Sequence, residues 1–258
     1  MMPRALTAPP AARPDYDRIP RGNTQKHVNR EVLRYLLERS GLNPAGRVLD
    51  VPCGAGELLT LLRQYWPAAT LAGCDLRPDA PGLPGLHYRP ADLSQPFAAD
   101  PAGPPFDLIT SVSGVMMFGN TQTFVASCAG QLRPGGQLLI TNDNVLTVRD
   151  RLSYLFTGRV RRFKLLFGPD EAITQLVQHQ ELLRLLTGQG LRVREVVYTS
   201  FYTEDLPFAL LALLLYPVQW LYVRGLRHPA SQALRRQLFG FRSLVCRHYI
   251  VVAEKPAA

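Results

Sequence analysis

Residues 48–59, VLDVPCGAGELL, decide the fold of this chain. An apolar run ends at Asp50, and a turn containing Gly54 and Gly56 then leads into a helical pattern. Glycine is needed in such a turn because the backbone must bend sharply and a ligand must approach it without a Cβ in the way. The stretch therefore predicts a strand, a ligand-binding turn and a helix, in that order.

The same turn departs from two common nucleotide-binding motifs. No third glycine or alanine follows Gly56 at the spacing of the dinucleotide fingerprint, which disfavours NAD(P). The Gly-Lys-Ser/Thr ending of a phosphate-binding loop is also missing. The ligand of this turn must therefore be identified from other parts of the sequence.

Short apolar runs of strand length occur along the chain, and helical patterns separate them. The runs lie at 47–51, 70–76, 86–93, 106–112 and 137–141, with two more at 192–202 and 246–255. Residues 56–66, 121–132 and 178–188 have the apolar spacing of helices that cover a sheet. Strands that alternate with helices predict an α/β fold with a parallel, doubly wound sheet.

Residues 48–59 resemble motif I of the class I, Rossmann-like, S-adenosylmethionine-dependent methyltransferases, in the variant with Pro52-Cys53 in place of Gly-Cys. Supporting elements follow in the order that this family has. FDLITSVSGVMMF (106–118) matches its fourth strand, and LRPGG (132–136) matches the turn into its fifth strand. The resemblance thus rests on several motifs between residues 47 and 141.

The resemblance implies which residues hold S-adenosylmethionine. Asp75 ends the second strand, where the acidic residue of the family takes both ribose hydroxyls, and Asp92 lies where the family meets the adenine amino group. Asp50 is expected to order the turn and the amino group of the ligand. The implied cofactor-binding residues are Asp50, Pro52, Cys53, Gly54, Gly56, Asp75, Leu76, Asp92, Leu93 and Ser111. The alternative for each aspartate is a structural role in a turn or a helix cap.

The resemblance also implies the order of the sheet and the extent of the domain. We expect seven strands in the order 3-2-1-4-5-7-6, with strand seven antiparallel. A single methyltransferase domain is predicted over residues 22–258, with helical insertions at 144–177, after strand five, and at 203–240, between strands six and seven.

The N-terminal region is predicted to hold a leader and a helix that precedes the sheet. Residues 1–21 are expected to be a flexible leader, because they carry prolines and charges and lack the apolar run of a secretory signal. Residues 22–41 predict the helix, with Thr24, Gln25 and Lys26 on its first turn. This helix either covers the cofactor or only packs on the sheet.

The implied activity is transfer of a methyl group to an oxygen or nitrogen atom of a small-molecule, glycan or lipid-linked acceptor. A hydroxyl acceptor would benefit from a general base. The predicted catalytic residues are Asp143, His179 and Tyr154, with Ser111, Ser113 and Asn144 as further polar candidates near the ends of strands four and five. His179 can instead simply begin a helix, and Tyr154 can be a core residue.

Residues 141–163, TNDNVLTVRDRLSYLFTGRVRRF, resemble a segment of a bacterial subgroup of these enzymes that is often associated with cell-surface glycan or lipid genes. That subgroup has Pro-Asn after the fifth strand, whereas this chain has Asp143-Asn144.

Met116, Met117 and Phe118 either wall the methyl-donor pocket or pack in the core.

Basic residues are concentrated in the C-terminal half of the chain. Residues 1–145 hold 13 Lys and Arg against 12 Asp and Glu, whereas residues 146–258 hold 16 against 8. Such an excess can mark a face for nucleic acid, anionic lipid or an acidic substrate, or only a solvated surface. A nucleic-acid methyltransferase or binder is therefore an alternative function. Against it, SVSGVMMF (111–118) replaces the Asn/Asp-Pro-Pro-aromatic run of the amino-methylating nucleic-acid enzymes.

Residues 206–223, LPFALLALLLYPVQWLYV, form a charge-free stretch that Pro207 and Pro217 interrupt. It is predicted either as a buried insertion or as a surface that dips into a bilayer, with arginines close behind it. A non-catalytic, cofactor-binding membrane adaptor is thus a further alternative. The four scattered cysteines predict no metal site and a cytoplasmic protein, with contact at the inner face of the membrane left open.

Overall fold

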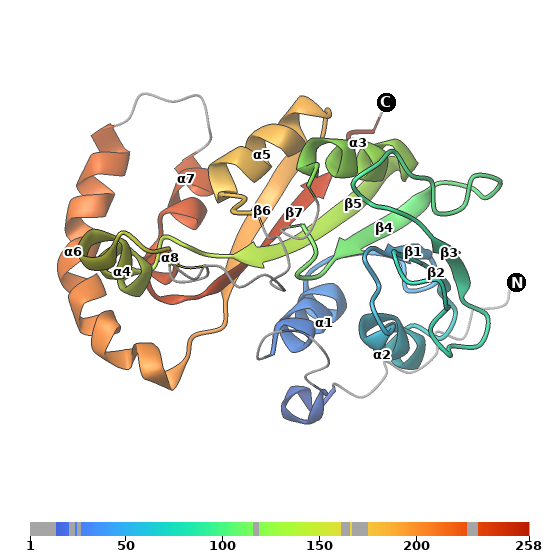
Figure 1. Ribbon diagram of the computed structural model, residues 1–258, viewed down its shortest axis with the longest axis horizontal. Helices are drawn as coiled ribbons and strands as arrows, with labels where there is room; N and C mark the ends of the chain where they lie inside the picture. Colours follow the sequence, from blue (N-terminus) through green and yellow to red (C-terminus); the bar gives the residue numbers. More distant parts are fainter. Residues whose placement is uncertain are drawn as a thin grey trace, which may run out of the picture.

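A seven-stranded sheet lies at the centre of the computed structural model, which describes residues 14–20, 24, 27–115, 119–160, 166, 175–225 and 232–257 (Figure 1). The strands are β1 (Arg47–Asp50), β2 (Thr70–Asp75), β3 (His87–Pro90), β4 (Phe106–Ser111), β5 (Leu132–Asp143), β6 (Arg192–Thr199) and β7 (His248–Glu254). Their order is β3-β2-β1-β4-β5-β7-β6. Strands β1 to β5 pair in parallel, and β7 is antiparallel to β5 and β6. The predicted fold class, strand order and direction of strand seven are confirmed.

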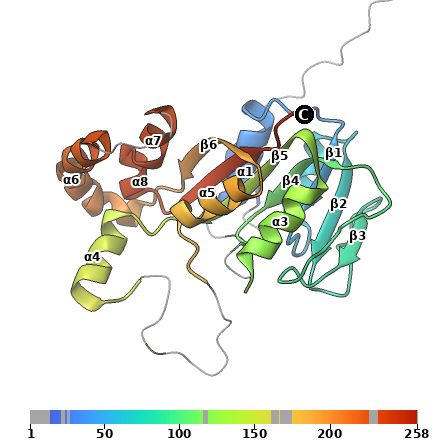
Figure 2. The ribbon, with the colours of Figure 1, turned by 90° about the horizontal axis from the view of Figure 1, so that it is seen from above.

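Helices cover both faces of this sheet (Figures 1 and 2). One face carries α1 (Val28–Glu38) and α2 (Glu57–Tyr65), and the other carries α3 (Thr121–Gln131) and α5 (His179–Gly188). Successive side chains of a strand point to opposite faces, so Val48 packs with α1 and α2 whereas Leu49 packs with α3 and α5. Burial on both faces explains why the central strands are almost continuously apolar.

The other helices gather beyond the carboxyl ends of β4 and β5, at the end of the molecule far from β3 (Figures 1 and 2). They are α4 (Val148–Thr157), α6 (Leu206–Gly225), α7 (Gln232–Leu238) and α8 (Phe241–Val245), with the short 3-10 helix η2 (Thr203–Asp205) ahead of α6. Helix α4 lies in the predicted insertion 144–177, and α6 and α7 lie in the predicted insertion 203–240. The two insertions therefore meet at one end of the sheet.

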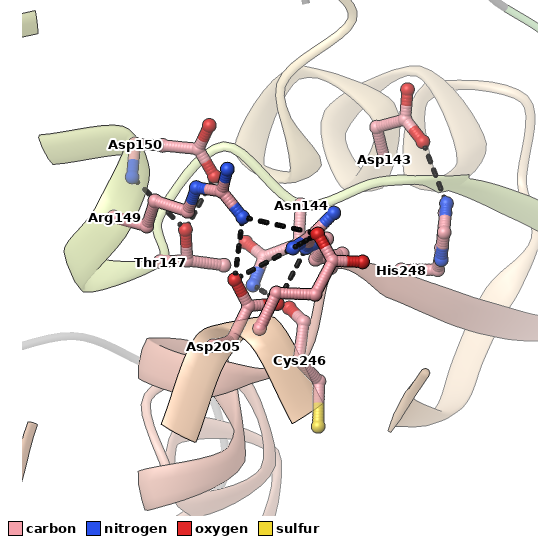
Figure 3. A network of polar contacts seen from close by, with 10 residues as sticks. Asp143, Asn144, Thr147, Arg149, Asp150, Asp205, Cys246 and His248 are labelled. Carbon is pink, nitrogen blue, oxygen red and sulfur yellow. Dashed lines mark hydrogen bonds and ion pairs between the residues drawn. The ribbon is translucent and has the colours of Figure 1, made fainter. Parts of the chain in front are cut away.

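A polar network fastens these helices to the sheet (Figure 3). Asp205, just before α6, accepts hydrogen bonds from Arg149 of α4 at 3.0 Å and from Arg247 at 2.7 Å. Asn144, which follows β5, donates its side-chain amide to the carbonyls of Ser243 and Cys246 at 2.8 and 2.7 Å. Side chains from four segments of the chain thus attach α4, α8 and the start of α6 to the ends of β5 and β7.

Helix α6 lies on the surface, so a buried insertion is the wrong alternative for residues 206–223. Together with η2 it forms a helix, 203–225, that is long and apolar enough to cross a membrane by length and composition. Only 6% of its most apolar window is buried, at a mean hydropathy of 1.7. Pro217 does not interrupt the helix.

The N-terminal segment differs in part from its prediction. Helix α1 begins at Val28, so Thr24 precedes the helix, and Gln25 and Lys26 lie outside the described residues. Within the predicted leader, residues 14–20 lie against α1: Ile19 is buried, and the Arg34 guanidinium is 4.7 Å from the Tyr16 ring centroid. The packing of α1 on the sheet is therefore observed, and its role over the cofactor stays a prediction.

Candidate active site

The glycine turn joins β1 to α2 at the carboxyl edge of the sheet. Gly54 and Gly56 have φ angles of +55° and +81°, in the left-handed region that favours glycine. The backbone N–H of Cys53 donates to the Cys74 carbonyl of β2 at 3.0 Å. On the other side, the N–H of Val51 donates to the Thr110 carbonyl of β4 at 2.8 Å. Both neighbouring strands therefore hold the turn in place.

Asp75, at the end of β2, lies against this turn. One carboxylate oxygen accepts the Gly54 N–H at 2.8 Å, and the other accepts the N–H of Arg77 at 3.2 Å. A Cβ placed on Gly54 would meet nothing nearer than the Glu57 carboxylate, 3.7 Å away. The backbone of the turn is thus open above Gly54, which is what a ligand lying across it needs.

Asp50 is a buried carboxyl group at the end of β1, only 3% exposed. Its carboxylate accepts a hydrogen bond from the Thr110 hydroxyl at 2.7 Å. Burial, aided by the negative charges of Glu57 and Asp75, raises the pKa of Asp50 to about 7. Three acidic groups around one turn favour a cationic ligand, and S-adenosylmethionine carries both a sulfonium and an amino group.

The loop after β4 closes against the turn. A Cβ on Gly114 would come within 2.2 Å of the Pro52 ring, so only glycine fits at that position. Ser111, at the end of β4, is fully buried, and its hydroxyl has no hydrogen-bond partner among the described residues. Met116, Met117 and Phe118 lie outside the described residues. The structure thus brings the predicted residues Pro52 and Ser111 to the same small region.

The predicted residues on the β3 side of the sheet are spread more widely. Asp92 is exposed and accepts hydrogen bonds from the backbone N–H and the hydroxyl of Ser94 at 2.9 and 2.7 Å, which lower the pKa of the aspartate. Leu76, next to Asp75, is 73% exposed, whereas Leu93 is buried. The turn role of Asp92 is therefore observed, and its contact with adenine stays a prediction.

On the other side of β4, Asp143 and His248 form a pair (Figure 3). Asp143 ends β5 and lies opposite His248 at the start of β7, and the Asp143 carboxylate is 3.1 Å from His248 Nε2. The side chains are 14% and 5% exposed. Sequence reasoning selected Asp143 but missed His248, because the register that places the two side by side cannot be seen in the sequence.

The other predicted catalytic residues lie elsewhere. His179 is 3% exposed and packs edge-on against Phe239 and Tyr249, and its burial lowers its pKa to about 4. Tyr249 follows His248 in β7, so the two side chains point to opposite faces of the sheet and His179 lies on the far side from Asp143. Tyr154 is 62% exposed on α4 and is not a core residue. Asn144 supports α8 and β7, as described above.

A doubly wound sheet of this order, with an acidic glycine turn at its carboxyl edge, defines a Rossmann-like methyltransferase. Residues 24–196 match the family described as a methyltransferase domain, and the chain belongs to this family. It is an enzyme that uses S-adenosylmethionine.

Curated relatives and solved structures agree with this class. The chain is 31% identical over 186 residues to a ubiquinone biosynthesis O-methyltransferase of Aromatoleum aromaticum, covering 67% of this chain and 75% of the relative. It is 36% identical over 112 residues to a trans-aconitate 2-methyltransferase of Azoarcus sp., covering 42% and 43%. A methyltransferase structure from Archaeoglobus fulgidus has the same fold, with a TM-score of 0.53, 15% identity and coverage of 88% and 93%.

Proposed function

We propose that this enzyme methylates a hydroxyl oxygen of a small-molecule acceptor that binds at the Asp143–His248 pair. The observation that carries the proposal is the contact of 3.1 Å between the Asp143 carboxylate and His248 Nε2 at the carboxyl edge of the sheet. A carboxylate that holds one imidazole nitrogen orients the ring and makes it a better base. Such a pair suits an acceptor that must lose a proton.

The cofactor in this proposal lies across the turn that follows β1. The Asp75 carboxylate accepts hydrogen bonds from the ribose hydroxyls, and the open backbone at Gly54 lets the cofactor approach closely. The negative charge of Asp50 favours the cationic end of the cofactor. When bound, S-adenosylmethionine supplies the methyl group to the acceptor oxygen. Pro52, Cys53, Gly56, Leu76, Asp92, Leu93 and Ser111 complete the proposed cofactor site.

The acceptor site in this proposal lies two strands from Asp50. Neighbouring strands are about 4.8 Å apart, so β1 and β5 are separated by roughly 10 Å. The loop after β4 is tied to β5, because the Ser113 N–H donates to the Thr141 hydroxyl at 2.8 Å. Thr141 and Asp143 point to the same face of β5, since they are two residues apart. The acceptor would therefore reach both the pair and the methyl donor.

The acceptor hydroxyl would transfer its proton to the Asp143–His248 pair as its oxygen is methylated. The charge that develops on the acceptor oxygen is thereby removed within the site. The name of the Aromatoleum relative, an O-methyltransferase, supports an oxygen acceptor. An amine acceptor would gain less from such a pair, because a neutral amine is already a nucleophile.

The test is methyl transfer from isotopically labelled S-adenosylmethionine to a panel of phenols, alcohols, carboxylic acids and amines, with products identified by mass spectrometry. We expect hydroxyl acceptors to turn over. His248→Gln and Asp143→Asn should each lower kcat by about 100-fold or more, the usual contribution of a general base, while the affinity for S-adenosylmethionine stays unchanged. The exposed His87 on β3 supplies the matched control, His87→Gln.

Two results would contradict this proposal. Turnover restricted to amines or carboxylic acids would show that no hydroxyl proton has to be removed. Full kcat on a hydroxyl acceptor in both variants would show that the pair is structural. Binding of S-adenosylmethionine, measured by calorimetry, separates loss of the acceptor chemistry from loss of the fold.

A further inference from the structure

Helix α6 carries a stripe of exposed apolar side chains along its outward side. Leu206, Leu210, Leu213, Leu214, Val218, Leu221 and Tyr222 are all at least 59% exposed. They recur at intervals of three or four residues, with adjacent pairs at 213–214 and 221–222, so they share one side of the helix. The opposite side packs on the core through Phe208, Ala212 and Tyr216. At 1.5 Å per residue, the stripe runs for about 24 Å.

Helix α4, which lies beside α6, exposes apolar side chains of its own. Its last turn exposes Tyr154, Leu155 and Phe156, each by at least 62%. Helices α4 and α6 are in contact, since the Arg151 guanidinium donates to the Gln219 side chain at 2.7 Å. We name the α6 stripe and these three residues the α4–α6 apolar face. Soluble monomers rarely expose an apolar stripe of this length together with further large apolar side chains nearby, so the face calls for a partner.

A basic, aromatic cavity of about 640 Å³ adjoins the C-terminal end of α6. Its lining consists of Tyr216, Trp220, Val223, Arg224, Arg235, Arg236 and Phe239. The Arg224 guanidinium lies 5.1 Å from the Trp220 ring centroid. Guanidinium groups bind phosphate in a bidentate manner, and tryptophan and tyrosine favour the boundary between lipid and water. The cavity therefore has the chemistry of a phosphate head-group site beside an apolar surface.

We propose that the α4–α6 apolar face docks on an anionic phospholipid membrane, with α6 lying in the plane of the interface and the three arginines of the cavity at the head groups. Charge selects this partner. A second copy of the chain would bring two basic C-terminal halves together. Each half, residues 146–258, has 16 Lys and Arg against 8 Asp and Glu. A leaflet of anionic lipid supplies the opposite charge.

Packing of α6 on the domain favours a position on the membrane rather than across it. The inner side of the helix is packed on the core, and the Gln219 amide donates to the Phe239 carbonyl at 2.9 Å. A helix that spanned the bilayer would lose these contacts. The hydrogen bonds of Asp205 to Arg149 and Arg247 keep the docked helices attached to the sheet beside His248. Docking would thus hold the acceptor side of the enzyme next to the lipid.

The test is flotation of the full chain with phosphatidylcholine vesicles, with and without phosphatidylglycerol. We expect flotation with the mixed vesicles and release at high salt. Leu210→Gln/Leu214→Gln should lower the partition coefficient at least tenfold, because the docked leucines are removed while glutamine keeps the helix. Arg224→Gln and Arg236→Gln should each lower it about fivefold, which corresponds to about 1 kcal/mol per basic residue at an anionic surface.

Controls separate docking from other causes. Arg184→Gln, at an exposed arginine on α5, removes the same charge away from the face and should float like the wild type. Unchanged calorimetric affinity for S-adenosylmethionine shows that each variant is folded, and this readout does not depend on the acceptor. Absence of flotation, flotation equal in all variants, or release by detergent alone would overturn the proposal. So would a lipid-free dimer that Leu210→Gln/Leu214→Gln dissociates, because the face would then bind a second copy.

Discussion

Asp75 accepts a hydrogen bond from the backbone N–H of Gly54 at 2.8 Å, although 21 positions separate the two residues in the chain. The end of β2 and the turn after β1 are therefore one unit. A single carboxylate orders the turn, and in the proposed cofactor site it would also accept hydrogen bonds from the ligand. Removal of this side chain should affect cofactor binding more than it affects the fold, because Asp75 lies at the edge of the sheet.

Asp75→Ala is expected to weaken S-adenosylmethionine binding at least tenfold, measured by calorimetry. The reason is loss of a doubly hydrogen-bonded, charged acceptor, worth about 1.5–3 kcal/mol. Asp79→Ala, four residues further along at an exposed position, is the matched control and should bind normally. An unchanged affinity in folded Asp75→Ala protein would show that this edge is not the ribose site.

Asp50→Asn is expected to stabilise the cofactor-free protein at about pH 8 and to weaken cofactor binding. The folded pKa of Asp50 is about 7, above the ordinary value of 3.8. A carboxyl group whose pKa is raised in the folded state stabilises that state at low pH, where it is protonated, and this contribution is lost as the pH rises through the folded pKa. Ionised Asp50 therefore destabilises the free protein at about pH 8. Each kcal/mol regained should raise Tm by about 2–4 °C in thermal unfolding.

The same variant tests the charge of the turn in the bound state. If a cationic ligand favours ionised Asp50, wild-type affinity should fall as the pH drops through about 7, and binding should release protons. Calorimetry in buffers with different ionisation enthalpies measures that release. Equal proton release in wild type and Asp50→Asn would contradict a role for this carboxylate in the site.

Gly114→Ala is expected to destabilise the protein and to weaken cofactor binding. The new methyl group would lie within 2.2 Å of the Pro52 ring, which is held in the cofactor turn. Relief of such overpacking costs about 1–3 kcal/mol and would displace one of the two loops. Gly82→Ala adds a methyl group in open space and should leave Tm and affinity near the wild-type values. Both quantities can be read from thermal shift with and without ligand.

His179→Gln is expected to keep enzymatic activity and to make the protein less sensitive to acid. Burial lowers the pKa of His179 from 6.5 to about 4, so the folded state holds the neutral ring. Unfolding then takes up a proton below 6.5, and stability is lost as the pH falls toward 4. Urea unfolding at about pH 7 and about pH 5 should show a smaller loss in the variant. A large fall in kcat would instead support the predicted catalytic role.

Most of the cofactor half of the enzyme follows from local sequence. The strands, the glycine turn at Gly54 and Gly56, and Asp75 at a strand end are properties of short segments, because each depends on apolar periodicity or on a backbone conformation that favours glycine. The order of the sheet came from the resemblance of those segments to a known family. The structure confirms that order and places Asp50 and Asp75 around one turn.

The proposed acceptor half was decided by contacts between distant residues. His248 gains a partner only because β7 runs antiparallel to β5 in a register that sets it opposite Asp143. The sequence shows a histidine before an apolar run, and the register depends on how β6, β7 and the insertions fold together. The position of His179 also depends on tertiary packing, because its helix, α5, covers the opposite face of the sheet from Asp143 and His248.

The sequence by itself determined that residues 206–223 would be charge-free and apolar, and it left open whether they would be buried. The tertiary structure decided that one side of α6 packs on the core and the other stays exposed beside α4. An almost uniformly apolar helix has no polar side that could predict which side faces outward. The available packing surface, to which α8 and α4 contribute most, makes that choice.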